Sequence, residues 1–437
     1  MPQRITPFAP SAYRSGNEKE LLLECLESNN WSSFKGATEG WELKQVGTMT
    51  SEEAEQYGPL ENRFLGGKFV RKLEGQFAHM MGVDYCVSAN SATSCLVVAI
   101  GALNLGPGDE VLVPSMSFNA TATAILSYNA IPVFCEVKDD TFCIDPDDIL
   151  KKLTERTKAI MVVHLGGNGA AMEEVVEIAE KNNLFIIEDC AQAPGVKYKN
   201  RFLGTLGDVG VFSLTETKNI SCGEGGLLIT NNKNIAMKAR LIRNHGEGIV
   251  EDDWSDDELV NIVGMNYRLT EFQAAVAIPQ LNDLYKRNEK RKELTKYLLK
   301  GLEDFNEVLI PPKVENGVDY CCYMLKWKWK PKKGMISRDQ LVSAMKREGI
   351  PLSAGYGRMM HENPIFTRSL AYTKGCPFSC QHGQGTLAKY GKGTLPVSEN
   401  VNQQFIWFKF INPPNTKDDM DDVISAFKKV LRKKPVK

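Results

Sequence analysis

The chain has 437 residues, of which 43% are hydrophobic and 24% are charged, a composition typical of a globular protein of two or three domains. Its formal net charge of −1 gives no field that would attract nucleic acid or an anionic membrane, so we expect neither as a main partner. No apolar run approaches the roughly 18 residues that cross a membrane. Residues 1–10 lack the apolar core of a signal peptide, and we therefore expect a cytoplasmic protein.

The N-terminal part of the chain is predicted to hold two helices, at residues 18–28 and 70–81, the second with apolar residues at helical spacing. Between them, residues 31–67 are rich in glycine, contain two tryptophans and show no periodicity. A segment of this length without regular structure is uncommon in a compact domain unless it lines a site. We expect it to shape a substrate opening or a subunit surface, and a plain surface insertion is the alternative.

Small polar residues, Asn90 to Ser94, separate a predicted strand at 85–88 from a predicted helix at 95–105. Free backbone N–H groups and the helix dipole make such a helix start a binding site for an anion, and the Ser and Thr hydroxyls add donors. Serine and threonine are also common in this position as ordinary helix caps. This stretch alone therefore leaves both interpretations open.

From residue 110 onward, short apolar strands alternate with helices, which predicts a mostly parallel sheet covered by helices on both faces. The predicted strands are 110–114, 131–137, 159–164, 184–188 and 209–214, and the predicted helices between them are 119–128, 149–153 and 172–182. Ligands of such folds collect at the carboxyl ends of the strands. Phe118, Asp189, the turn near Thr93 and the loop of Lys218 all follow predicted strands, so we expect them at one edge of the sheet.

Lys218 lies between the strand end at 209–214 and a glycine-rich turn, Gly223 to Gly226. A lysine in this position points into a cleft, and a lysine amine removed from water is a nucleophile toward carbonyl groups. Taken alone, a lysine such as Lys218 is more commonly a surface lysine in a polar loop. The other residues expected at the same edge favour the functional interpretation.

The C-terminal part begins after two further helices, predicted at 235–243 and at 270–292, the second continuing toward residue 302 with a possible kink at Pro279. Strands are predicted at 322–330 and 404–411, helices at 338–348 and 417–432, and irregular structure over most of 355–395. We predict two domains: residues 1–302 form a large α/β domain, and residues 303–437 form a smaller α+β domain.

Most of the eleven cysteines stand singly in apolar segments, which is typical of a protein from a reducing compartment. Cys376, Cys380 and His382 come nearest to a metal-binding cluster, but their spacing matches no usual zinc site and a fourth ligand is not evident. We therefore expect no metal.

An anion-binding turn, an aromatic residue, a buried acid and a lysine at one sheet edge together suit pyridoxal 5′-phosphate (PLP). The helix start would take the phosphate, and Phe118 would cover one face of the ring. The carboxylate of Asp189 would pair with the pyridine nitrogen and keep the ring an electron sink. Lys218 would hold the aldehyde as a Schiff base and later move protons.

Several longer motifs resemble the DegT/DnrJ/EryC1/StrS family of PLP-dependent sugar aminotransferases. The matching stretches are GPGDEVLVPSMSFNATATAI (106–125), IIEDCAQAPG (186–195), GDVGVFSLTETKNISCGEGGLLIT (207–230), RNHGE (243–247) and MNYRLTEFQAAV (265–276). The resemblance covers residues 68–300 well and the C-terminal third loosely. It implies the type I aminotransferase fold and a small-molecule transamination.

The resemblance also implies roles for individual residues around the cofactor ring. Lys218 matches the lysine that carries the cofactor, and Asp189 matches the acid at the pyridine nitrogen. Gln192 matches a residue near the ring hydroxyl, and Phe118 stands where the family has its stacking aromatic. His361 falls near a C-terminal histidine of the family.

The phosphate ligands follow from the same resemblance. Ala92 and Thr93 stand where the family has Gly-Thr, so that Ala92 is a departure by one methyl group. Ser213 matches another phosphate ligand. Asn266 matches an asparagine that reaches the phosphate from the neighbouring subunit, which implies a homodimer with shared active sites.

The sequence therefore favours an aminotransferase that moves an amino group from glutamate or glutamine to a keto sugar, most simply a nucleotide-linked one, in amino-sugar biosynthesis. The same chemistry on a keto-cyclitol is an alternative. In a dehydratase branch of the family the lysine is replaced by histidine, and Lys218 argues against that branch. A non-catalytic sensor or assembly protein on the same fold is a third alternative.

Overall fold

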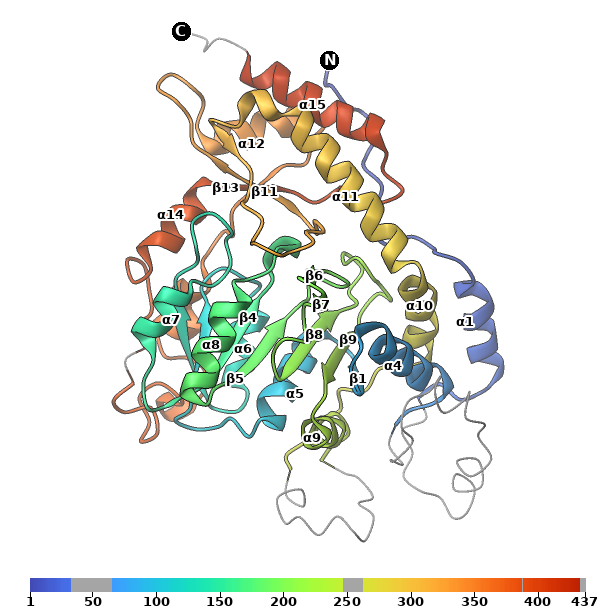
Figure 1. The fold of residues 1–437 in the computed structure, drawn as a ribbon, viewed down its shortest axis with the longest axis vertical. Helices are drawn as coiled ribbons and strands as arrows, with labels where there is room; N and C mark the ends of the chain where they lie inside the picture. Colours follow the sequence, from blue (N-terminus) through green and yellow to red (C-terminus); the bar gives the residue numbers. More distant parts are fainter. Residues whose placement is uncertain (33–64, 247–261, 387, 433–437) are drawn as a thin grey trace.

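The centre of the molecule is a seven-stranded sheet, seen in the computed structural model of Figure 1, which describes residues 1–32, 65–246, 262–386 and 388–432. Its strands are β1 (Tyr85–Ala89), β2 (Glu110–Pro114), β3 (Ile131–Cys135), β4 (Thr157–Val163), β5 (Phe185–Asp189), β8 (Val209–Ser213) and β9 (Gly226–Thr230). They lie in the order β1-β9-β8-β5-β4-β2-β3. In this sheet β9 is antiparallel to both of its neighbours, and the other strands all run in one direction.

Helices cover both faces of this sheet because its strands are apolar on both sides. One face packs against α4 (Lys68–Met81), α7 (Pro146–Lys152), α8 (Met172–Asn182) and α10 (Glu271–Asn282). The other face packs against α5 (Ala92–Ala102), α6 (Ala120–Leu126) and α9 (Lys233–Arg243). Successive residues of β2 show the division, since Leu112 belongs to the first core and Val111 and Val113 to the second. The predicted α/β class with a mostly parallel sheet is confirmed.

A second, four-stranded sheet has the order β10-β11-β13-β12. Its strands are β10 (Leu309–Ile310), β11 (Leu325–Trp329), β12 (Ser353–Ala354) and β13 (Phe405–Phe408), and it shares a core with α11 (Leu284–Gly301), α12 (Arg338–Arg347) and α15 (Lys417–Leu431). The start of the chain also lies here, because Arg4 forms ion pairs with Asp419 and Asp422 of α15 at 2.7 and 2.9 Å (Figure 1). The domain boundary after residue 302 stays a prediction.

The remaining elements are short or peripheral. The helix α1 (Glu18–Glu27) lies beside α10, and a small hairpin joins β6 (Lys197–Tyr198) to β7 (Arg201–Phe202). Short helical segments are η1 (Leu165–Gly167), η3 (Glu303–Phe305), η4 (Met360–Glu362), α13 (Pro364–Thr367), η5 (Thr373–Gly375) and α14 (Pro396–Gln404).

The predicted elements differ from the structure in two instructive places. The helix expected from residue 95 begins at Ala92, because the Ser91 side chain caps it by accepting from the Ser94 N–H. The single kinked helix expected over 270–302 is wrong: α10 ends at Asn282 and α11 begins at Leu284. Pro279 has no N–H to donate, so the last turn of α10 lacks one hydrogen bond and the helix ends within that turn.

The longest elements that were not predicted from the sequence are β9 and α14. The strand β9 was missed because it directly follows a glycine-rich turn, and α14 begins directly after the stretch 355–395 that was interpreted as irregular. The segment 31–67 lies almost entirely outside the described residues.

Candidate active site

Five of the predicted site residues lie at or directly after strand ends on the carboxyl edge of the large sheet. Ala92 and Thr93 follow β1, Phe118 follows β2, Asp189 ends β5, and Lys218 follows β8. These four strands run in the same direction, so their carboxyl ends share one edge.

Asp189 is buried at the end of β5 and is held by two neutral donors. The hydroxyl of Thr121 donates to its Oδ2 at 2.9 Å, and the N–H of Ala191 donates to its Oδ1 at 3.1 Å. Burial raises the pKa of Asp189, whereas these two hydrogen bonds and the charge of Lys218 lower it. A cation placed beside this carboxylate would therefore be strongly favoured, which is the property that a pyridinium nitrogen requires.

Lys218 is half-buried in the loop after β8 and lies close enough to Asp189 for its charge to act on that carboxyl. Its Nζ is 4.4 Å from the ring centroid of Tyr323. The Tyr323 hydroxyl is also 3.2 Å from the hydroxyl of Thr217, the residue before the lysine. One aromatic side chain from the segment before β11 thus contacts the lysine and its neighbour, and this fixes the direction of the lysine stem.

Gln192 lies three residues after Asp189 and is also buried. Its Oε1 accepts from the N–H of Gly166 at 2.7 Å, and its side chain hydrogen-bonds to the hydroxyl of Tyr356. Burial raises the pKa of Tyr356, on which the charges of Tyr323 and Asp189 also act. The structure thus brings Asp189, Gln192 and Lys218 together with two tyrosines from the C-terminal part of the chain.

The start of α5 and the end of β8 are adjacent across β9. Ala89, Gly226 and Ser213 are paired in register across these three strands. A Cβ at Gly226 would lie 2.4 Å from the carbonyl carbon of Ser91 and 2.5 Å from the nitrogen of Ala92, so only glycine lets the helix start come this close. One small region therefore contains the Ser213 hydroxyl and the first N–H groups of α5, at Ala92 and Thr93.

Two of the predicted site residues are exposed. Phe118 is 71% exposed, although its carbonyl accepts from the N–H of Thr121, which places its backbone one turn from the partner of Asp189. Asn266 is exposed on a segment bridged to Asn244. The described residues of this chain do not bring Phe118 or Asn266 into contact with the buried lysine and aspartate.

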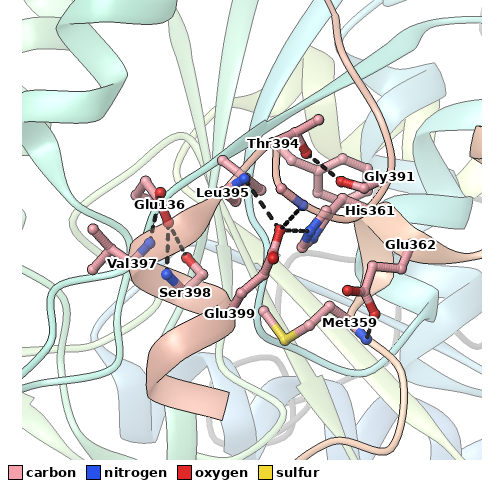
Figure 2. Close-up of polar contacts among 12 residues, drawn as sticks. Glu136, Met359, His361, Glu362, Gly391, Thr394, Leu395, Val397, Ser398 and Glu399 are labelled. Carbon is pink, nitrogen blue, oxygen red and sulfur yellow. Dashed lines mark hydrogen bonds and ion pairs between the residues drawn. The ribbon is translucent and has the colours of Figure 1, made fainter. Parts of the chain in front are cut away.

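His361 lies elsewhere, beside the edge strand β3, with its ring centroid 6.1 Å from that of Phe134. Its Nε2 is 3.2 Å from the Oε1 of Glu399, as Figure 2 shows. That oxygen also accepts from the N–H of Gly393 at 2.7 Å, while Glu136 accepts from two N–H groups at the start of α14. These carboxylates act as caps at a helix start, so His361 stands in a structural cluster three strands away from β5.

A second buried histidine, His164, has both ring nitrogens engaged. Its Nδ1 accepts from the N–H of Ala170, so its Nε2 donates to Glu188 at 2.9 Å. Glu188 also accepts from three N–H groups of the turn before β8, at Gly204, Leu206 and Gly207. This cluster holds the turn in place. The expectation of no metal at Cys376, Cys380 and His382 stays a prediction.

Three residues of the site were missed from the sequence: Thr121, Tyr323 and Tyr356. Thr121 carried a usable signal, since it lies in the matching stretch 106–125, at the start of the helix that follows the strand end. Tyr323 and Tyr356 gave no local signal, because only the packing of the C-terminal part brings them to the sheet edge.

The donor set fits PLP. The ring nitrogen would find a buried carboxylate that is held by neutral donors. The aldehyde would find a lysine close to that carboxylate, and the phosphate would find a hydroxyl beside a helix start. Fold and donor set together define a PLP-dependent enzyme of fold type I.

The comparison with known proteins agrees. Residues 51–387 match the DegT/DnrJ/EryC1/StrS aminotransferase family. The chain is 34% identical over 370 residues to L-glutamine:2-deoxy-scyllo-inosose aminotransferase of Streptomyces paromomycinus, covering 83% of this chain and 86% of that one. It is 33% identical over 304 residues to GDP-perosamine synthase of Escherichia coli O157:H7, covering 70% and 73%.

Among solved structures, an aminotransferase from Psychrobacter cryohalolentis superimposes with a TM-score of 0.79 at 26% identity, covering 97% of this chain and 98% of that one. The chain belongs to the DegT/DnrJ/EryC1/StrS family and is a PLP-dependent aminotransferase. No helix in the described part of the chain is long and apolar enough to cross a membrane.

Proposed function

We propose that this enzyme uses PLP carried on Lys218 to move an amino group from glutamate or glutamine to a ketone on a polyhydroxylated ring, foremost a nucleotide-linked keto sugar. The observation that carries the proposal is the joint placement of Lys218 and the buried Asp189 at one sheet edge, with the lysine close enough to act on the carboxyl. A lysine that is only a surface residue, or an aspartate that only caps a helix, would have no reason to lie beside the other of these two residues.

The residues that would hold the cofactor come from four strand ends. The first N–H groups of α5, at Ala92 and Thr93, and the hydroxyl of Ser213 would bind the phosphate. Asp189 would pair with the ring nitrogen, and Gln192 would lie at the ring hydroxyl.

Two exposed residues would complete the site. Phe118 would cover a face of the cofactor ring. Asn266 would serve the site of the partner subunit, which accounts for its exposure within one chain and implies a homodimer.

When bound, the cofactor supplies an electron sink for the negative charge that develops on the substrate carbon. The protein's part is to hold charges and to move protons. Thr121 and Ala191 keep the carboxylate of Asp189 aimed and hydrogen-bonded. The Nζ of Lys218, directed by Tyr323, would take the proton from the amino-bearing carbon of the donor. In the second half-reaction it would deliver a proton to the former carbonyl carbon of the acceptor.

The keto-cyclitol remains the second candidate acceptor, because the match to the scyllo-inosose aminotransferase is as strong as the match to the perosamine synthase and covers more of the chain. Both acceptors are ketones on a ring that also carries hydroxyl groups. They differ in the nucleotide, which only the sugar substrate would carry.

The test is an absorbance titration of the purified protein with PLP, followed by glutamate or glutamine. We expect a band at roughly 410–430 nm, as for a lysine-linked PLP, that shifts to the near ultraviolet with the amino donor and is absent in Lys218→Ala. The loaded protein is then offered a nucleotide-linked keto sugar and a free keto-cyclitol, and recovery of the band identifies the acceptor. A folded wild-type protein that shows no band after incubation with PLP would contradict the proposal and favour a non-catalytic role.

A further inference from the structure

A buried lysine next to the site has no carboxylate partner among the residues that the structure describes. On β11, Leu325, Trp327 and Trp329 face the C-terminal core, and Lys326 and Lys328 alternate with them. Lys328 pairs with Asp139 at 2.7 Å. Lys326 is fully buried, and its Nζ instead donates to the carbonyl oxygen of Leu165 at 2.6 Å.

The groups that face Lys326 are apolar or neutral. The Nζ lies 5.1 Å from the ring centroid of Phe142, and the thiols of Cys143 and Cys322 lie close enough to act on its pKa. Burial lowers the pKa of Lys326 to about 8, and the two thiols oppose this shift. Glu315 and Lys138, which act on Cys143, lie 3.9 Å apart as an ion pair of their own.

One peptide group connects this lysine to the cofactor site. The carbonyl of Leu165 and the N–H of Gly166 belong to the same peptide unit, in the turn η1 after β4. Lys326 donates to the carbonyl of that unit, and the N–H of the same unit donates to the Oε1 of Gln192 at 2.7 Å. A donor on a carbonyl polarises the peptide and strengthens the N–H on its other side.

The fit between lysine and turn is close. Gly166 has a φ of +66°, and a Cβ there would lie 2.9 Å from the Cε and 3.1 Å from the Nζ of Lys326. Glycine is therefore required both for the backbone conformation and for the approach of the lysine. The plane of the peptide is set by the lysine on one side and by Gln192 on the other.

We propose that Lys326 is a positioning residue of the cofactor site, which holds the 165–166 peptide so that the Gly166 N–H fixes the Oε1 of Gln192. Because the oxygen of the amide is fixed in this way, its NH₂ group is directed toward Tyr356 and the cofactor. This inference rests on the proposed function, in which Gln192 lies at the ring hydroxyl of PLP. Lys326 itself touches neither substrate nor cofactor.

The experiment compares Lys326→Met with wild type and with Lys328→Met, a matched control on the same strand face. The first readout needs no cofactor: we expect faster amide hydrogen exchange in peptides spanning residues 160–170 of Lys326→Met, and no change there in Lys328→Met. The second is the dissociation constant of PLP from absorbance titrations. We expect it to rise about ten-fold in Lys326→Met at pH 7, the effect of one lost hydrogen bond.

The pH dependence separates positioning from packing. A charged ammonium polarises the peptide more than a neutral amine, so the ratio of the two dissociation constants should fall as the pH rises through about 8. Lys326→Gln keeps a donor but no charge, so its dissociation constant should lie between those of wild type and Lys326→Met, and its ratio to wild type should fall over the same pH range. In a Gln192→Leu background, Lys326→Met should add no further loss of affinity.

The outcomes are distinguishable. If wild type binds PLP and Lys326→Met binds it equally well, or if the hydrogen exchange changes without any change in affinity, the positioning role is overturned and the proposed function stands. If wild type binds no PLP, the proposed function itself fails. Should Lys326→Met not fold, Lys326→Gln carries the test, and a ratio of its dissociation constant to that of wild type that stays constant as the pH rises through about 8 would contradict the inference.

Discussion

Asp189→Asn should separate stability from function at the centre of the site. The hydrogen bonds survive the substitution: the new carbonyl can accept from the Ala191 N–H, and the new NH₂ can donate to Thr121. The Thr121 hydroxyl, 2.8 Å from that of Ser117, then turns to donate to Ser117. The cost of a buried charge disappears, and it is this burial that raises the pKa of Asp189.

The expected free energy of unfolding follows from this balance. Without cofactor at pH 7, Asp189→Asn should be at least as stable as wild type, by up to about 2 kcal/mol. The sign depends on pH: a carboxyl whose folded pKa is raised stabilises the fold below the unfolded value of 3.8 and loses that contribution as the pH rises through the folded pKa. The stability advantage of Asp189→Asn should therefore be absent below pH 3.8 and should grow as the pH rises through the folded pKa of Asp189.

The catalytic rate of Asp189→Asn should fall, although its stability does not. Without the negative charge at the ring nitrogen, the rate of the half-reaction with glutamate should fall about 10²- to 10³-fold, the usual effect of removing one preorganised electrostatic group. Urea unfolding at several pH values and stopped-flow absorbance measure the two quantities. A variant destabilised by more than about 1 kcal/mol at pH 7, with an unchanged half-reaction rate, would refute this account of Asp189.

Three further substitutions test the framework of the site. Glu271→Ala removes a buried carboxylate that accepts from three N–H groups at the start of α4, and urea unfolding should show a loss of about 3 kcal/mol. Arg243→Met leaves the buried Glu74 without its 2.6 Å partner and should cost about 3–5 kcal/mol by the same assay. Gly226→Ala should push away the start of α5 and raise the dissociation constant of PLP at least about ten-fold, whereas Gly16→Ala, where the added Cβ meets nothing within 4 Å, should not.

The sequence alone predicts those site residues that directly follow a strand. Asp189 and Lys218 stand at the ends of apolar runs, and the alternation of strands with helices was enough to predict that these ends share an edge. The parallel sheet is therefore visible in the pattern, because each strand is buried on both faces and contains almost only apolar residues.

The contacts that hold these residues could not be predicted in the same way. Tyr323 lies 105 positions after Lys218, and Lys326 follows in a strand whose alternating tryptophans gave no reason to expect a buried charge opposite them. Such contacts depend on how the C-terminal part packs against the large sheet, which no local periodicity reports. The end of α10 after Pro279 was also missed, because the apolar pattern continues through the break.

The central claim is that Lys218 carries the cofactor, and borohydride reduction followed by peptide mass spectrometry tests it most directly. Reduction of the PLP-loaded protein converts the lysine linkage into a stable phosphopyridoxyl adduct. We predict a single modified peptide, the one that contains Lys218, and no adduct there in Lys218→Ala. A stoichiometric adduct on another lysine of the wild-type protein, or none at all, would contradict the account.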